Sequence, residues 1–318
     1  TLSMAGNSPT RTSGNIDVSN AAALIEFTNT SAITLPAYVF NGNVNNMTIN
    51  GTGGVTAGSD ITMNGILNLQ SANPSSIKGS LDMSNNTLIM GADATTIGIG
   101  DVIGIVKRSH TFNIAQDYDF GNQFTTLNFL GVSGSTLPNW ISYKIEIGNA
   151  PSWRSVGVRR FYSFAQDGGD DRVTSKLHYL DSELNVSETD ESKLLFWSGY
   201  FGPTFENAVI GGKSINDEND NWIELQGMPI DLLALSALDS KQLGLSYTNI
   251  STITWTGIGT AAYAGDWSMP GNWTGGVPTS EDDVLIPNPL PDGNFGYPDK
   301  NSLTSVYPSE AKTIEIES

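Results

Sequence analysis

Two loops rich in carboxylate and amide oxygens are the segments of this chain best suited to binding a metal cation. The first, Asp167-Gly168-Gly169-Asp170-Asp171, places the carboxylates of Asp167, Asp170 and Asp171 on a glycine-rich turn. The second contains Asp217, Asn219 and Asn221, whose spacing matches the first, third and fifth positions of a calcium loop. Because Ca²⁺ takes about six to eight oxygen ligands, each loop can supply part of a site. The sequence therefore leaves two interpretations open, calcium sites or solvated hairpin tips.

The second loop departs from an EF-hand at two positions. Trp222 stands where the calcium loop needs a glycine for its sharp turn, and Met228 stands where it needs a bidentate glutamate. An EF-hand is therefore excluded, and any calcium bound here would use a different ligand arrangement.

Catalytic patterns are weak throughout the chain. Glycoside cleavage needs paired carboxylates, one as acid and one as base or nucleophile. The candidate carboxylates of the amino-terminal part are Asp60, Asp82, Asp93 and Asp101. Lys78 is the only basic residue that we place near them, and neither His110 nor His178 lies by a nucleophile-elbow motif. The sequence thus predicts a protein that is not an enzyme.

The composition excludes several classes of function. Acidic residues outnumber basic ones by 33 to 15, giving a net charge of −18, whereas phosphate binding needs a basic face. The absence of cysteine excludes disulfides, thiolate metal sites and a cysteine nucleophile. No stretch is apolar enough for a membrane span. The chain begins at Thr1 without a signal peptide, which we interpret as a piece of a longer protein.

The hydrophobic pattern predicts an all-β protein in three parts. Only 15% of the residues are charged, and the abundant Asn, Ser, Thr and Gly suit tight turns between short strands. Over residues 1–106, strands of three to five residues alternate with turn clusters, as in a parallel β-solenoid, with an antiparallel sandwich as the alternative. Over residues 107–250, longer strands with more aromatic residues predict an antiparallel β-sandwich.

Residues 251–318 change character again and predict the start of a further solenoid unit. This stretch is rich in Trp and Pro and ends in a segment that alternates like a strand, Lys312 to Glu317. Trp267 and Trp273 can stack on sugar rings. They can equally plug the open end of a solenoid, where its apolar interior would otherwise meet water, and we favour the plug.

The same segment resembles a known family. The motifs that carry the resemblance are Trp255-Thr256-Gly257, Asp266-Trp267, Asn272-Trp273, Val277-Pro278-Thr279 and Asp282-Asp283-Val284. In this order they resemble the opening motif of repeat modules in very large surface proteins of Bacteroidota, where the motif typically caps and starts a β-solenoid. The resemblance implies a structural cap made by Trp255, Trp267, Trp273 and Pro278.

Shorter likenesses extend over nearly the whole chain, among them Gly104 to Arg108 at the exit from the solenoid and Arg159 to Tyr162 in the sandwich. The family resemblance implies export by type IX secretion and display on the cell surface, often in gliding or adhesion proteins. It brings no catalytic residues. We see no carboxy-terminal sorting domain of the kind that this route needs, which fits a piece of a longer chain.

Two functional hypotheses follow. The first is a non-catalytic structural or adhesive module of a secreted surface filament, whose partners are neighbouring repeats of the same chain and other surface or secretion proteins. The second is a glycan-binding or glycan-cleaving surface protein of the lyase or glycosidase kind. The second predicts a groove with exposed aromatic residues and converging carboxylates, and the first does not.

Overall fold

We describe the fold from a computed structural model. The structure describes residues 1–70, 80–151, 157–185, 190–199, 209–210, 213–230, 241–247, 252–256, 267, 272–273, 283–286 and 313–316. Nearly all regular structure in these residues is strand, and the 3-10 turns η1 (Asp181–Glu183) and η2 (Glu191–Lys193) are short. Among the described residues, no helix has the length and hydrophobicity that crossing a bilayer requires.

The amino-terminal part is a parallel β-solenoid of about four turns, each of which we call a coil. One wall is a parallel sheet of β1 (Leu2–Met4), β3 (Leu24–Phe27), β6 (Asn46–Ile49), β9 (Ile66–Leu69) and β11 (Thr95–Gly98). A second wall, also parallel, contains β4 (Ile33–Thr34), β7 (Val55–Thr56), β10 (Leu81–Met90) and β12 (Val102–Arg108). The remaining short strands are β2 (Ile16–Asp17), β5 (Phe40–Asn41) and β8 (Ile61–Met63).

Stacked rows of apolar side chains hold the coils together. Ile25 pairs in register with Met47, and Met47 pairs with Leu67, so three successive coils place a buried side chain at the same position. Along each strand these residues alternate with more exposed ones, because successive side chains of a strand point to opposite faces. The alternation read from the sequence is thus the inner and outer face of the wall.

Glycines allow the coils to approach closely at their corners. A Cβ atom on Gly51 would lie 2.2 Å from the backbone oxygen of Asn29 in the preceding coil, and one on Gly53 would lie 2.2 Å from that of Ser31. Neither glycine needs a left-handed conformation, so the requirement is for space alone. The glycine-rich turn after β6 is therefore a packing surface between coils.

We expect Gly51→Ala to lower the free energy of unfolding by about 3 kcal/mol, because the backbone that the new methyl group meets cannot move aside as a side chain would. Gly6→Ala is the matched control, since nothing lies within 4 Å of a Cβ atom at that position. Chemical denaturation of both variants measures the difference. Equal stability of the two would show that the coils are not in close contact at Gly51.

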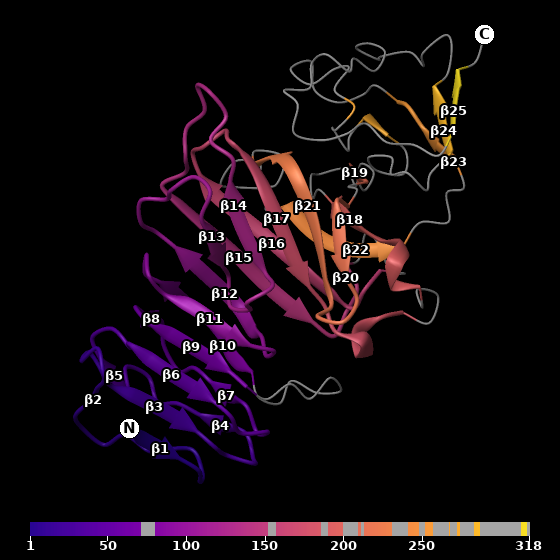
Figure 1. Cartoon of the computed structure of the whole chain (residues 1–318). Helices are drawn as coiled ribbons and strands as arrows, with labels where there is room; N and C mark the ends of the chain where they lie inside the picture. The colour runs from indigo at the N-terminus through magenta and orange to yellow at the C-terminus, as the bar shows by residue number, and fades with distance from the viewer. Residues whose placement is uncertain are drawn as a thin grey trace.

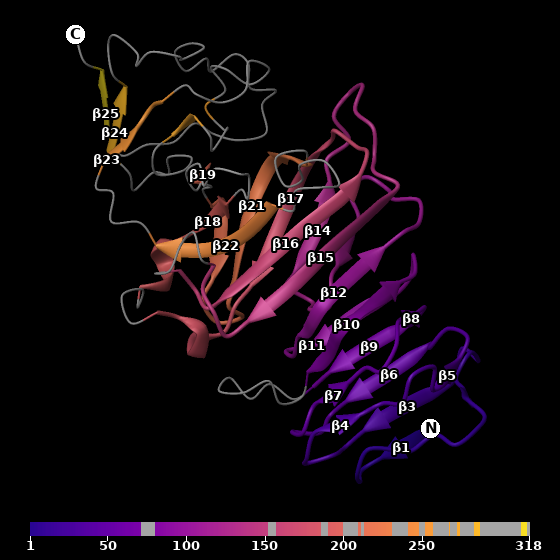
Figure 2. The same ribbon diagram turned by 180° about the vertical axis from the view of Figure 1, so that it is seen from behind.

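The sandwich follows directly on the second wall. That sheet continues through β15 (Trp140–Ile147), β16 (Arg160–Asp167), β22 (Lys241–Tyr247), β18 (Leu194–Gly199) and β19 (Val209–Ile210), now antiparallel. The facing antiparallel sheet is β13 (Asp117–Asp119), β14 (Thr126–Phe129), β17 (Arg172–His178), β21 (Trp222–Pro229) and β20 (Ile215–Asp217). Figures 1 and 2 show the solenoid strands and the sandwich strands following one another in one continuous body.

A single strand, β12, belongs to both parts. It pairs in parallel with β10 of the solenoid and antiparallel with β15 of the sandwich, so one sheet of ten strands runs through both. Residues 106 and 107, where the sequence pattern changes, lie inside this strand. Most buried apolar residues of the solenoid and the sandwich likewise form one cluster, which runs from Val18 to Leu245.

A separate parallel sheet forms near the carboxyl end. It consists of β23 (Thr252–Thr254), β24 (Asp283–Ile286) and β25 (Thr313–Ile316). Both views place this sheet beyond the sandwich, at the end of the molecule opposite to β1 (Figures 1 and 2). The expected all-β class, a parallel solenoid followed by antiparallel sheets, is confirmed, and the last sheet has the parallel pairing expected of another solenoid start.

Candidate functional site

Two buried arginines lie where the solenoid meets the sandwich, a region that we call the junction. Arg108 ends β12, and Arg160 begins β16. Each side chain is 1% exposed. A buried charge is tolerated only when it is paired and hydrogen-bonded, so each of these two arginines must have charged or polar partners inside the junction.

Arg160 joins three parts of the chain. Its Nη1 and Nη2 atoms donate to the two carboxylate oxygens of Asp101, at 2.8 and 2.7 Å. Its Nε and Nη2 atoms donate to the two carboxylate oxygens of Glu183, at 2.7 and 2.9 Å. Asp101 directly precedes β12, and Glu183 lies in η1 after β17. One guanidinium therefore ties the last solenoid coil to both sheets of the sandwich through two bidentate pairs, the strongest geometry for such contacts.

His178 completes this group, which we call the junction cluster: Asp101, Arg160, His178 and Glu183. The Nδ1 atom of His178 lies 3.2 Å from Oδ1 of Asp101, and the hydroxyl of Tyr162 donates to the His178 carbonyl at 2.5 Å. Both residues are buried. The cluster is thus held from β16, from β17, from η1 and from the loop before β12.

The electrostatics of the cluster keep its charges in place. Burial by itself raises the pKa of Asp101, but Arg160 and His178 outweigh burial and hold that pKa well below its usual range. Burial lowers the pKa of Arg160, while Asp101 and Glu183 raise it well above its usual value. Asp101 therefore contributes its full stabilisation above the ordinary aspartate pKa, and this contribution is lost as the pH falls from there through the lowered folded pKa.

Arg108 closes the last coil of the solenoid. Its guanidinium donates to the backbone carbonyls of Gly91, Ala94 and Asp119, at 2.8, 2.7 and 2.8 Å. It also lies 3.3 Å from the Asp119 carboxylate, whose other oxygen accepts from the backbone and hydroxyl of Thr96 at 3.0 and 2.6 Å. Burial raises the pKa of Asp119 although Arg108 opposes the rise. Arg108 thus satisfies coil carbonyls at the end of the stack, where unpaired groups would be costly.

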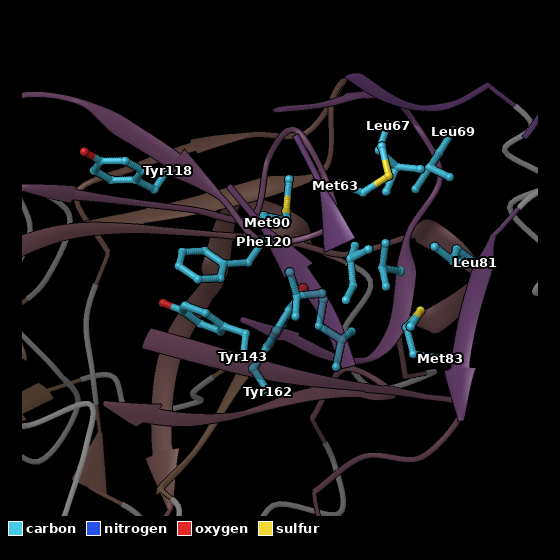
Figure 3. Close-up of a cluster of buried hydrophobic side chains, with 14 of the residues drawn as sticks. Met63, Leu67, Leu69, Leu81, Met83, Met90, Tyr118, Phe120, Tyr143 and Tyr162 are labelled. Carbon is cyan, nitrogen blue, oxygen red and sulfur yellow. The ribbon is translucent and has the colours of Figure 1, made fainter. Parts of the chain in front are cut away.

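Aromatic side chains fill the core between the two parts. Figure 3 shows Met63, Leu67 and Leu69 of the solenoid on one side and Tyr118, Phe120, Tyr143 and Tyr162 on the other. The ring of Phe120 lies 4.7 Å from that of Tyr143, and Tyr143 meets Phe164 edge-on at 4.9 Å. All three rings are fully buried. The junction is therefore a packed core and not a hinge between two separate cores.

Sequence reasoning missed the partner of Asp101. The expectation that Asp60, Asp82, Asp93 and Asp101 have only Lys78 near them is wrong for Asp101, because Arg160 lies 59 residues away in the sequence yet binds it directly. The signal available was indirect: a pair of arginines at 159–160 in a chain poor in basic residues. The other three aspartates are not brought into the junction cluster, and Asp60 and Asp82 accept hydrogen bonds from the backbone of Thr87 and Ser84.

The first acidic loop is engaged by donors of the chain itself. Asp171 is fully buried, and its oxygens accept from the backbone of Gly131 and Val132, each at 2.7 Å, and from the Ser135 hydroxyl at 2.8 Å. Asp170 accepts from Thr136, and Asp167 accepts from Asn139 at 3.2 Å. The three carboxylates thus tie the turn after β16 to the loop between β14 and β15.

The second loop is organised locally. The Oδ1 atom of Asp217 accepts from the backbone of Asn219 and Asp220, at 2.9 and 3.1 Å, and Asn221 donates to Asp181 at 2.6 Å. Within the part of the chain that the structure describes, no three His, Asp or Glu side chains gather as they would around a metal ion. Calcium binding at either loop stays a prediction, and an ion there would have to replace these donors.

The tryptophans of the carboxyl-terminal segment pack on one another. Trp255 and Trp273 meet edge-on at 4.7 Å, Trp267 and Trp273 at 4.6 Å, and the indole of Trp273 donates to the Trp267 carbonyl at 2.7 Å. All three are buried, in a cluster with Val284 and Ile286 of β24. Three of the four expected cap residues therefore come together beside a parallel sheet. Pro278 lies outside the described residues.

Two tryptophans of the sandwich, Trp140 and Trp222, each have a lysine on one face. The ammonium of Lys107 lies 4.3 Å from the Trp140 ring, and that of Lys176 lies 3.8 Å from the Trp222 ring. A cation over the ring face is itself a stabilising contact. A sugar ring could stack on these faces only by displacing the lysine.

Comparisons with protein-family models, with curated proteins and with solved structures find no match for this chain. The interpretation of function therefore depends on the residues and the geometry described above.

Proposed function

We propose that this chain is a non-catalytic structural module of a large cell-surface filament or adhesin. The observation that carries the proposal is the junction: a solenoid and a sandwich share the strand β12, one apolar core and the buried junction cluster. A module that transmits force along a chain needs such a rigid connection. An enzyme would need a cleft with reactive groups, whereas these charges are sealed in the interior.

The carboxyl-terminal sheet supports the same proposal. Its strands pair in parallel, as those of the first part of the chain do, and its buried tryptophan cluster packs beside them. Alternation of solenoid and sandwich, continued by further units, would produce an elongated array in which each unit contacts its neighbours. Export by type IX secretion and display on the outside of the cell are proposed with it, and they rest on the family resemblance of residues 255–284.

Pulling the whole chain by its ends in a single-molecule force experiment tests the mechanical role. We expect the last solenoid coil and the sandwich to unfold in one event, because β12 pairs with strands of both parts and Arg160 joins Asp101 to Glu183. Opening of the last coil at low force, while the sandwich stays folded, would contradict the proposal.

A parallel assay addresses the catalytic alternative. Incubation of the chain with neutral and acidic polysaccharides is followed by measurement of newly formed reducing ends. We expect none above the level of a heat-denatured sample. Release of reducing ends would contradict the scaffold proposal and indicate a glycan-cleaving enzyme. Glycan binding without cleavage is compatible with the scaffold.

A further inference from the structure

Tyr38 is the most unusual exposed residue of the solenoid. Its side chain is 73% exposed, and its backbone has a φ of 53°, in the left-handed region that favours glycine. A bulky side chain rarely adopts this conformation, and a large exposed aromatic ring gains nothing from the core. Strain of this kind persists only where the surrounding structure imposes it, and it is concentrated at functional sites.

The neighbouring coils impose the conformation of Tyr38. Its backbone N–H donates to the hydroxyl of Ser59 in the following coil at 2.9 Å. Its carbonyl accepts from the amide of Asn15 in the preceding coil at 2.7 Å. Because both backbone groups are held, the ring is presented outward at a fixed point on the solenoid corner.

A guanidinium is anchored at the same corner. Arg11 donates to the carbonyl of Gly14 at 2.5 Å, to the carbonyl of Ala37 at 3.4 Å and to the Asn15 side chain at 3.3 Å. These contacts use three of about five N–H groups that an arginine carries, so donors remain. Arg11 is exposed, and it is the only basic residue in residues 1–70. Arg11 is thus anchored to the backbone of Ala37 and to the side chain of Asn15, which itself holds the Tyr38 carbonyl, so the ring and the guanidinium belong to the same solenoid corner.

We propose that Tyr38 and Arg11 form a binding site for a neutral polysaccharide. The ring of Tyr38 would stack on the apolar face of a pyranose, and the free N–H groups of Arg11 would donate to its hydroxyl oxygens. The charge of the chain decides against an acidic polysaccharide. Residues 1–70 carry Asp17, Glu26 and Asp60 against the single arginine, and the whole chain has a net charge of −18. That field repels a polyanion.

The inference deepens the proposed function, since it gives an adhesive module a ligand, but it does not depend on the junction. Tyr38 lies on the outer corner after β4, far in sequence from Asp101 and Arg160. A failure of the scaffold proposal would appear in the force experiment, and a failure of this site would appear in polysaccharide binding.

Affinity electrophoresis through gels that contain a soluble β-glucan, a mannan or a xylan tests the site on the whole chain at about 0.15 M salt, where surface charges are screened. We expect the wild-type chain to be retarded by at least one of these neutral polysaccharides. We expect Tyr38→Asn to weaken that retardation by about tenfold or more, as for a central contact residue. Tyr38→Phe keeps the ring and should keep binding, and Arg11→Gln should show partial loss.

The stability of the variants separates binding from folding. Asn tolerates the left-handed conformation, so Tyr38→Asn should melt at the wild-type temperature or about 2–4 °C above it. Ser84→Asn is the matched control, because Ser84 also has a left-handed backbone, with a φ of 52°, and should bind like wild type. Unchanged binding by Tyr38→Asn, loss of binding by Tyr38→Phe, or retardation by alginate alone would overturn the proposal, as would absence of retardation in every neutral gel.

Discussion

Arg160→Met is expected to lower the free energy of unfolding by about 3–5 kcal/mol, because it leaves the buried carboxylates of Asp101 and Glu183 without their cation. Methionine approximates the length of the side chain, so the lost charge and hydrogen bonds dominate the effect. Arg159→Met is the matched control. Arg159 is exposed and donates to the Ser182 carbonyl, so its replacement should change stability by less than about 1 kcal/mol. Chemical denaturation of the two variants measures the difference.

The pH dependence of Arg160→Met distinguishes loss of charge from loss of packing. Without Arg160, burial raises the pKa of Asp101 against His178 alone, so the folded variant takes up a proton more readily than the wild type does. Because proton binding then favours the folded variant, the difference in the free energy of unfolding between the variant and the wild type becomes smaller as the pH falls from 7 toward about 5. A deficit that stays constant over this range would mean that the variant is destabilised by packing alone.

Phe120→Ala is expected to have an effect of similar size, about 3–5 kcal/mol, because it removes a large, fully buried ring from the core of the junction. The cavity can hardly collapse. Phe120 packs against the Tyr143 ring and lies near the guanidinium of Arg108, which hydrogen bonds to backbone carbonyls hold in place.

Phe161→Ala is the control for Phe120→Ala, since Phe161 is only half-buried on β16. It should lower the free energy of unfolding by about 1 kcal/mol. Thermal melting of both variants gives the comparison. If Phe120→Ala were no worse than this control, the solenoid and the sandwich would not share a tightly packed core.

The strand pattern was predictable because its cause is local. Alternation of apolar and polar residues in Met47-Thr48-Ile49 and Leu67-Asn68-Leu69 follows from the two faces of a strand and needs no knowledge of distant residues. Turn residues between such strands indicated short strands and close spacing. These two signals together predicted a solenoid followed by a sandwich, as the structure has them.

The boundary between the two parts could not be resolved in this way. Residues 102–108 alternate in a manner compatible with either neighbour, and only pairing shows that β12 serves both. The acidic turn at 167–171 was ambiguous for a related reason. A carboxylate suited to a cation is equally suited to backbone N–H groups, and the chain brings those groups from 131–136.

From the sequence alone we could predict an all-β protein with short strands, favour parallel coils followed by an aromatic sandwich, and read an acidic composition, while the tryptophan cap followed from the family resemblance. Only the tertiary structure shows which distant residues of the chain contact one another. Asp101 meets Arg160 across 59 residues, and Tyr38 is held between Asn15 and Ser59 of adjacent coils. The physical reason is that propensity and periodicity act over a few residues, whereas charge pairing and backbone strain depend on which distant segments the folded chain brings together.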